Sequence, residues 1–321
     1  MQLKKGPEAR APDFKEALGS NRLQEVRRIP KSDLHNHSML GSKRSTLEKM
    51  LGIRFSRFAP KEGSIRELNG WLAANYRPLF DRPEAFEKAV EGTFLQARSD
   101  GVVLLEMSMD LMFGKMFRVP VEKIIAVFQR LHGEIAPGIE FRPEIGMART
   151  LPVRTILAGL EPYLDSGFFR SVDLYDDESA QPIENFRELY RFFKRSGLKL
   201  KAHAGEFGTA ESVREAVEVL DLDAVQHGIA AAGSPGVMKW LAERGVRLNI
   251  CPASNIRLKR TASYKTHPIR VLYDHGVKVT VNSDDVLLFG AGVSEQFLGL
   301  YRSGAFSAEE LEEIRMTGLT S

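Results

Sequence analysis

The sequence has one cysteine, no long apolar run and almost no net charge. Cys251 has no second cysteine with which to form an internal disulfide, which is typical of proteins from a reducing compartment. No stretch approaches the roughly 20 apolar residues of a membrane helix. The first 18 residues lack the apolar core of a signal peptide. These absences favour a cytoplasmic protein without a membrane partner.

The charge balance gives no indication of a nucleic-acid partner. The chain has 45 basic and 42 acidic residues, a formal net charge of +3, which does not indicate binding to nucleic acid. Hydrophobic residues make up 43% and charged residues 27%, as in ordinary soluble globular proteins. A chain of 321 residues suits either two average domains or one α/β barrel.

A short junction recurs along the chain, in which a helical pattern ends, one glycine follows and a β-rich apolar run begins. Glycine just beyond a helix takes the left-handed conformation that closes the last turn, and the chain then leaves as a strand. The junction therefore predicts alternating helices and strands. It occurs at Gly101, Gly197, Gly245 and Gly276, and in a weaker form at Gly167.

Eight apolar runs are predicted to be strands, and the helices between them have readable starts. Ser45 and Glu48 have the spacing of a capping box, and Pro235 after Ser234 suits a first helical position. Strands that alternate with helices pair in parallel through right-handed crossovers. The eight runs cover residues 32–37, 102–107, 140–146, 170–174, 198–203, 224–227, 247–251 and 278–282.

This pattern predicts an α/β fold, a single (β/α)8 TIM barrel over residues 29–321, with residues 1–28 as an N-terminal extension. An open doubly wound sheet is the alternative. That fold usually has a glycine-rich phosphate loop after the first strand, and we find none in this sequence.

Four of the predicted strands end in residues that can bind a metal or move protons. The carboxyl ends of barrel strands form the active site, and side chains two apart on a strand point to the same side. Each residue alone is weak evidence, but a barrel gathers these strand ends around one axis. Three imidazoles and one carboxylate suit one Zn²⁺ per chain, with a position left for water. The residues are His35, His37, His203, Glu206, His227, Asp284 and Asp285.

With these residues in view, the sequence resembles the adenosine deaminase family of the amidohydrolase superfamily. The resemblance rests on KSDLHNH at 31–37, HAGE at 203–206, HG at 227–228, CPASN at 251–255 and NSDD at 282–285. Asp173 and Leu174, followed by Asp177 and Glu178, are similar to the end of the family's fourth strand. The motifs run in family order from the first strand to the last.

The resemblance implies a hydrolytic deaminase of an aminopurine that releases ammonia. His35, His37, His203 and Asp284 would hold the zinc, and a bound Zn²⁺ can lower the pKa of water from ~15.7 to about 7. His227 would orient the attacking oxygen and stabilise charge, and the second oxygen of Asp284 would share the proton of the water.

The resemblance also implies the substrate contacts. Glu206 would protonate the ring nitrogen beside the reacting carbon, and Asp285 would bond another ring nitrogen. Gly205, Tyr175 and Asp176 are further expected substrate contacts.

Two departures from the family pattern fall on substrate contacts. Ser38 and Met39 follow His37, where adenosine-specific members have a carboxylate nearby, and Tyr175 and Asp176 replace alanine and glycine. We therefore expect adenosine to be a poor substrate and a modified aminopurine, bulky or anionic, to be better. The basic residues that would favour an anion could equally be solvated loop charges: Lys43, Arg44, Arg257, Lys259 and Arg260.

Two other functions stay open at this point. The barrel could be a mononuclear amidohydrolase acting on another C–N or C–O bond, or a non-catalytic binding protein. No lysine ends the fourth strand to bridge two metals, which favours one metal, and Cys251 is read as buried packing, not as a nucleophile. The exact purine, the oligomeric state and the pathway are left open.

Overall fold

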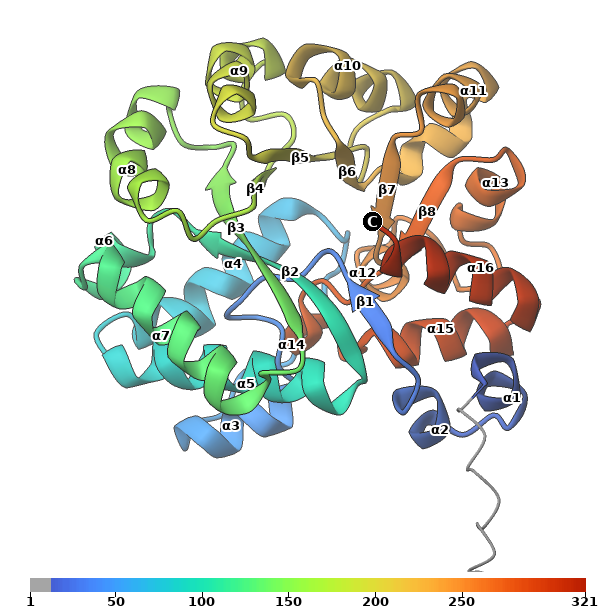
Figure 1. The fold of residues 1–321 in the computed structure, drawn as a ribbon, viewed down its shortest axis with the longest axis horizontal. Coiled ribbons are helices and arrows are strands. Elements are labelled where there is room, and N and C mark those ends of the chain that lie inside the picture. The colour runs from blue at the N-terminus through green and yellow to red at the C-terminus, as the bar shows by residue number, and fades with distance from the viewer. Residues whose placement is uncertain (1–12) are drawn as a thin grey trace, which may run out of the picture.

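The computed structural model describes residues 13–321, which form a (β/α)8 barrel. Every strand pairs in parallel with the next one along the chain, in the order β1 to β8 (Figure 1). The predicted fold class is confirmed. The strands are β1 (Lys31–Asp33), β2 (Val102–Asp110), β3 (Glu140–Ala148), β4 (Ser171–Tyr175), β5 (Lys199–Ala204), β6 (Ala224–His227), β7 (Arg247–Ile250) and β8 (Lys278–Val281).

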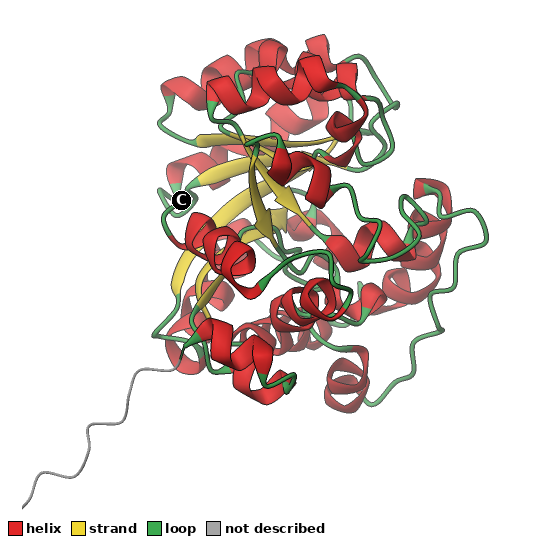
Figure 2. Ribbon diagram, turned by 90° about the vertical axis from the view of Figure 1, so that its right-hand side faces the viewer, coloured by secondary structure: helices red, strands yellow, loops and turns green. Residues whose placement is uncertain are grey.

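Helices surround the strands, as Figure 2 shows. Their apolar faces pack on the outside of the barrel and form one continuous hydrophobic core with the strands. Among the described residues, no helix is both long and apolar enough to cross a membrane.

The helices have the following bounds. The α-helices are α1 (Phe14–Gly19), α2 (Leu23–Arg27), α3 (Arg44–Leu51), α4 (Ile65–Tyr76), α5 (Pro83–Ser99), α6 (Phe113–Phe117), α7 (Val121–Ile135), α8 (Val153–Asp165), α9 (Arg187–Arg195), α10 (Ala210–Leu220), α11 (Pro235–Arg244), α12 (Pro252–Arg257), α13 (Ile269–Asp274), α14 (Val286–Phe289), α15 (Val293–Arg302) and α16 (Ala308–Leu319). The 3₁₀ helices are η1 (Arg77–Leu79), η2 (Ile183–Phe186) and η3 (Ile229–Gly233).

The glycine junctions have the predicted left-handed backbone. Their φ angles run from 61° at Gly167 to 80° at Gly197. The prediction for Ser234 is also confirmed, because its side chain caps α11 and Pro235 takes the first helical position. At these junctions, a glycine in the left-handed conformation thus marks the change from helix to strand.

Two local predictions differ from the structure. No capping box forms at Ser45, because α3 already begins at Arg44 and the Glu48 carboxylate accepts from the backbone N–H of Phe55 instead. A capping box with the same Ser-to-Glu spacing does form at Ser64, where it starts α4. The first strand is also shorter than predicted.

Beyond Asp33, the chain that follows β1 makes isolated contacts in place of a ladder. Asn36 pairs with Asp284 and His37 pairs with Ser108, each in a single parallel bridge. His35 and His37 therefore lie on an irregular segment held between the two neighbouring strands.

The first and last strands meet at a seam. In the described chain no ladder joins β8 to β1; the Asn36–Asp284 bridge and side-chain bonds connect them instead. The Asn282 side chain accepts from the backbone of Leu34 at 2.8 Å. At the other end of the barrel, α16 packs against both strands (Figure 1), and Gly318 allows close approach because a Cβ there would lie 2.2 Å from the Ser32 hydroxyl.

The segment before β1 covers one side of the barrel. Phe14 of α1 stacks edge-on against Phe297 of α15, with ring centroids 5.2 Å apart. Arg27 of α2 pairs with Glu295 at 2.8 Å. The first twelve residues of the predicted extension lie outside the described residues.

Candidate active site

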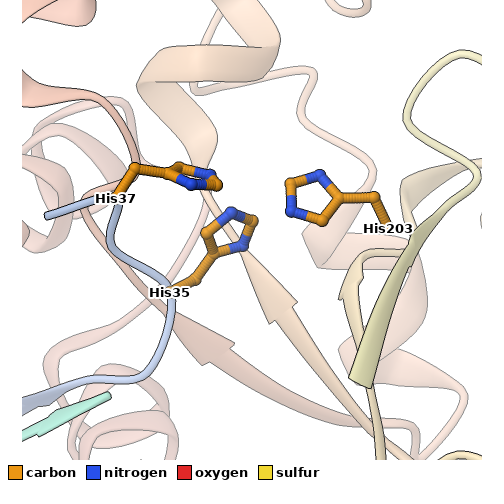
Figure 3. Close-up of side chains that lie close together, drawn as sticks. All are labelled: His35, His37 and His203. Carbon is orange, nitrogen blue, oxygen red and sulfur yellow. The ribbon is translucent and has the colours of Figure 1, made fainter. Parts of the chain in front are cut away.

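Three histidines meet at the carboxyl end of the barrel. His35 and His37 come from the segment after β1, and His203 comes from the end of β5. Their ring centroids are 4.8 to 5.6 Å apart, and the three rings face a common space in Figure 3. One ligand nitrogen from each ring lies within 4.8 Å of the others.

The carboxylate of Asp284 completes this group. Its Oδ1 lies 3.6 Å from Nε2 of His37 and 3.8 Å from Nε2 of His35. Asp284 follows β8, so it reaches the histidines across the seam of the barrel. The four residues predicted as metal ligands are thus brought together.

The group fits a metal on an observation independent of its composition. Both ring nitrogens of His35 are buried, and within residues 13–321 neither has a hydrogen-bond partner. Burial, and then the neighbouring imidazoles, hold the pKa of His35 well below its usual value. The ring is therefore neutral, which is the form that binds metals. Asp173 lies 3.2 Å from Nε2 of His203, as carboxylates that orient metal-binding histidines commonly do.

Glu206 and His227 lie beside this group. Oε2 of Glu206 is 3.4 Å from Nε2 of His227, and that nitrogen is 3.8 Å from Oδ2 of Asp284. Burial, and then the charge of Asp284, raise the pKa of Glu206 to about 8. Glu206 is therefore largely protonated at neutral pH and can act as an acid. His203, Glu206 and His227 are also close enough to hold a metal, so composition alone does not choose the ligands.

The loop that carries Glu206 is held by a second carboxylate. Glu178, in the loop after β4, accepts from the backbone N–H of Gly205 at 2.6 Å and from those of Glu206 and Phe207 at 2.9 Å each. Gly205 has a φ of 70°, and a Cβ there would lie 2.3 Å from a methyl of Val213. The turn thus requires glycine. Gly205 uses its N–H on Glu178 and does not line the cavity beside the metal group.

A cavity of about 280 Å³ opens above these groups. Asp285 lines it, and its buried Oδ1 has no partner in the described part of the chain. Burial, followed by the charges of Asp284 and Glu206, holds the pKa of Asp285 well above its usual value. The other side chains of the lining are mainly apolar and include Leu40, Ile65, Leu68, Leu72, Met116, Leu258 and Phe289.

Comparisons with known proteins identify the family of this chain. Residues 59–321 match the model of the adenosine deaminase family. An adenosine/adenine deaminase homologue from Treponema pallidum is 32% identical over 91% of this chain and 99% of its own. The chain belongs to the adenosine deaminase family. It is accordingly a hydrolytic deaminase.

Solved structures share the fold. The adenine deaminase from Arthrobacter aurescens superposes with a TM-score of 0.80 at 24% identity, covering 91% of this chain and 93% of that one. A Burkholderia ambifaria amidohydrolase with bound zinc has a TM-score of 0.79 at 22% identity, covering 99% and 89%.

Two residues of this deaminase that were expected to contact the substrate make hydrogen bonds to other side chains of the protein. Tyr175 donates its hydroxyl to Asp110, and its ring lies 5.4 Å from that of His37. Asp176 accepts from Asn69 at 2.7 Å and from Thr150 at 2.6 Å, so both of its oxygens are used. Both residues line the cavity, and the bond from Asn69 to Asp176 also attaches α4 to the barrel.

The basic loop residues do not form the expected mouth of the deaminase cavity. Lys43 pairs with Glu295, Arg44 lies near Glu48, and Lys259 donates to a backbone carbonyl. None of the five basic residues lines the 280 Å³ cavity. An anionic substituent therefore finds no support from these side chains.

The backbone at this deaminase site is strained. Asp176, His227 and Asp284 have φ angles of 78°, 63° and 58°, a left-handed region that non-glycine residues rarely adopt. Such conformations cost about 1–3 kcal/mol each and cluster at functional sites. The residue types at these strand ends do not predict a left-handed backbone.

Several residues around the deaminase site were missed as site residues by the sequence interpretation. Asp173 contacts His203, and Ser254 donates to Glu206 at 3.4 Å. Asn255 contacts both His227 and Glu206. The CPASN motif was the available signal for the last two, but it gave no role.

Proposed function

We propose that this protein is a zinc-dependent hydrolase that removes the exocyclic amino group of an aminopurine. The observation that carries the proposal is the position of Glu206, an acid with a raised pKa that lines one cavity together with His37, His203 and Asp284. Ring deamination needs both a nucleophile and an acid at the ring. Membership of the family and likeness to an adenine deaminase support the same reaction.

The metal would be held by His35, His37, His203 and Asp284. When bound, Zn²⁺ lowers the pKa of water to about 7 and so makes a nucleophile available at neutral pH. The unpartnered nitrogens of buried His35 support this assignment.

Glu206 would supply the proton that the ring requires. Attack of water on the aromatic carbon makes that carbon tetrahedral, so the adjacent ring nitrogen must take up a proton. Glu206 donates it, because its raised pKa keeps the carboxyl protonated at neutral pH. The C–O bond remains as a carbonyl, the C–N bond breaks and ammonia leaves. Of the two protons of the attacking water, one goes to the leaving amino group and the other returns to Glu206.

His227 and Asp284 would orient the attacking oxygen, since Nε2 of His227 lies near carboxylate oxygens of both Glu206 and Asp284. Asp285 would bond a second ring nitrogen. Its unpartnered Oδ1 and its raised pKa make it a carboxyl group that can donate to such a nitrogen. The purine would thus be held by hydrogen bonds at two edges.

The cavity favours a base over its nucleoside. Residues 38–41 contain no carboxylate to accept a ribose hydroxyl. The rim from α4 is apolar at Ile65, Leu68 and Leu72. We therefore expect adenine, or an adenine with an apolar substituent, to react better than adenosine or adenosine monophosphate.

The test is ammonia release, with the change in ultraviolet absorbance, from zinc-loaded protein and each of adenine, adenosine, adenosine monophosphate and an N6-substituted adenine. Turnover of at least one aminopurine is expected, with adenine ahead of adenosine. Zinc-loaded protein that releases no ammonia from any of the four would contradict the proposed function. A clear preference for adenosine would contradict only the substrate proposal.

A further inference from the structure

Three buried polar side chains form a chain that ends at His227. Nδ1 of His227 lies 3.3 Å from Nδ2 of Asn255 on α12. Oδ1 of the same amide lies 3.2 Å from Nε2 of His267, in the loop before α13. Nδ1 of His267 in turn accepts from the backbone N–H of Ile269 at 3.1 Å. All three side chains are at most 1% exposed.

The direction of every bond in this chain follows from its last member. A backbone N–H can only donate, so Nδ1 of His267 carries no proton. Burial lowers the pKa of His267 to about 3, so the ring is neutral and its single proton is on Nε2. That proton is donated to Asn255 Oδ1.

The amide then transmits this direction to the active site. With Oδ1 turned to His267, Asn255 presents its NH₂ group to Nδ1 of His227, and an NH₂ group can only donate. Nδ1 of His227 is therefore an acceptor. An imidazole ring whose Nδ1 accepts a hydrogen bond carries its proton on the other nitrogen, so the proton of His227 is on Nε2.

We propose that Asn255 and His267 are positioning residues that fix His227 in the tautomer with its proton on Nε2. The proton then points to the cavity side, 3.4 Å from Glu206 and 3.8 Å from Asp284. His227 is therefore a fixed hydrogen-bond donor to the attacking oxygen, and its Nε2 is not available as a metal ligand. A histidine free to exchange tautomers would present an acceptor there part of the time.

The geometry gives Asn255 a second contact with the same machinery. The other hydrogen of its NH₂ group faces Oε1 of Glu206 at 3.5 Å. The backbone carbonyl of Asn255 accepts from Arg260, which holds the loop after α12. The NH₂ group of Asn255 can therefore donate to both His227 and Glu206. Neither an aspartate nor a serine at this position could donate two hydrogen bonds.

The tautomer can be read without a substrate. Zinc-loaded protein with ¹⁵N-labelled histidine is examined by long-range ¹H–¹⁵N correlation, and the His227 signal is identified by its loss in His227→Gln. The expected result is a protonated Nε2 and an unprotonated Nδ1 at neutral pH. A protonated Nδ1, or exchange between the two forms, would overturn the inference even if no variant of Asn255 or His267 folds.

Variants then test the relay, by which we mean the hydrogen bonds that run from His267 through Asn255 to His227. Asn255→Asp keeps size but cannot donate, so the His227 proton should appear on Nδ1, with kcat lower by about 10²-fold and zinc content retained. His267→Gln places an amide N–H near the former Nε2, so His227 should keep the wild-type tautomer. His267→Phe offers no such donor, so His227 should exchange between its two tautomers. His132→Gln, in α7, is the control and should leave the tautomer unchanged.

The role in turnover rests on the proposed function, and the two can fail separately. If Asn255→Asp still shows the Nε2-protonated form, the relay is wrong. If the tautomer changes as expected but ammonia release does not, the relay holds and the role proposed for His227 in deamination is wrong.

Discussion

The carboxylate of Glu178 accepts a 2.9 Å hydrogen bond from the backbone N–H of Glu206. With the bonds from Gly205 and Phe207, this one side chain holds three consecutive N–H groups. The acid proposed for ring protonation is therefore positioned through its backbone by a residue from the neighbouring strand end.

Replacing Glu178 with glutamine should loosen Glu206 without removing it. Glutamine keeps one acceptor oxygen but turns an NH₂ group toward backbone donors. We expect kcat to fall roughly 10- to 100-fold, as for small misplacements of catalytic groups, with zinc content unchanged. Steady-state kinetics and metal analysis check this, with exposed Glu184→Gln on η2 as the control. Equal kcat in both variants would show that the three bonds do not position the acid.

Glu206→Gln separates acid catalysis from metal binding. Glutamine has the size and polarity of glutamic acid but no carboxyl proton, so ammonia release should fall by at least about 10²-fold. Zinc content should remain that of the wild type. A variant that lost zinc and recovered full activity on adding it would mean that Glu206 is a ligand and not the acid.

Removing a proposed ligand should affect metal, activity and stability together. His35→Ala is expected to lose both bound zinc and ammonia release, because the site loses a buried neutral imidazole. The wild type should also gain thermal stability as zinc is added, since a ligand that binds only the folded state stabilises it. His275→Ala, at an exposed position, serves as the control. Undiminished zinc in His35→Ala would contradict the ligand assignment.

The rim of the cavity should have its own pH dependence. Glu67 accepts from four backbone N–H groups, those of residues 61–64, and these bonds, led by that of Lys61, lower its pKa to about 2. A depressed folded-state pKa stabilises the folded form above the unfolded pKa, near 4.3, and the contribution is lost as pH falls through about 2.

Glu67→Gln should therefore be less stable than the wild type at pH 6 and approach it near pH 2. Urea unfolding of both proteins at several pH values measures the difference. The exposed Glu62→Gln is the control. A difference that stays constant between pH 6 and pH 2 would contradict this account.

The barrel could be predicted from sequence because local signals agreed with it. Glycine junctions and apolar runs marked the strands, and the polar residues at their ends marked the site. The capping box could not be placed in the same way. Ser45 with Glu48 and Ser64 with Glu67 have identical spacing, and only the path of the chain decides that Glu48 turns to Phe55.

The residues that support the site were beyond local reasoning for the same reason. Glu178 meets Glu206 from another strand end, and His267 meets Asn255 through a loop whose path the sequence does not reveal. Motif similarity marked Asn255 but could not say what its side chain touches.

Because the proposed metal site spans the seam between β8 and β1, metal binding would affect how the two ends of the sheet are held together. His35 and His37 lie on one side of the seam and Asp284 lies on the other. An ion bound by all three would therefore link the two ends of the sheet. Because such an ion would bind only where both ends of the sheet are in place, its binding would stabilise the closed barrel. Metal binding and closure of the barrel at this seam would then be thermodynamically coupled.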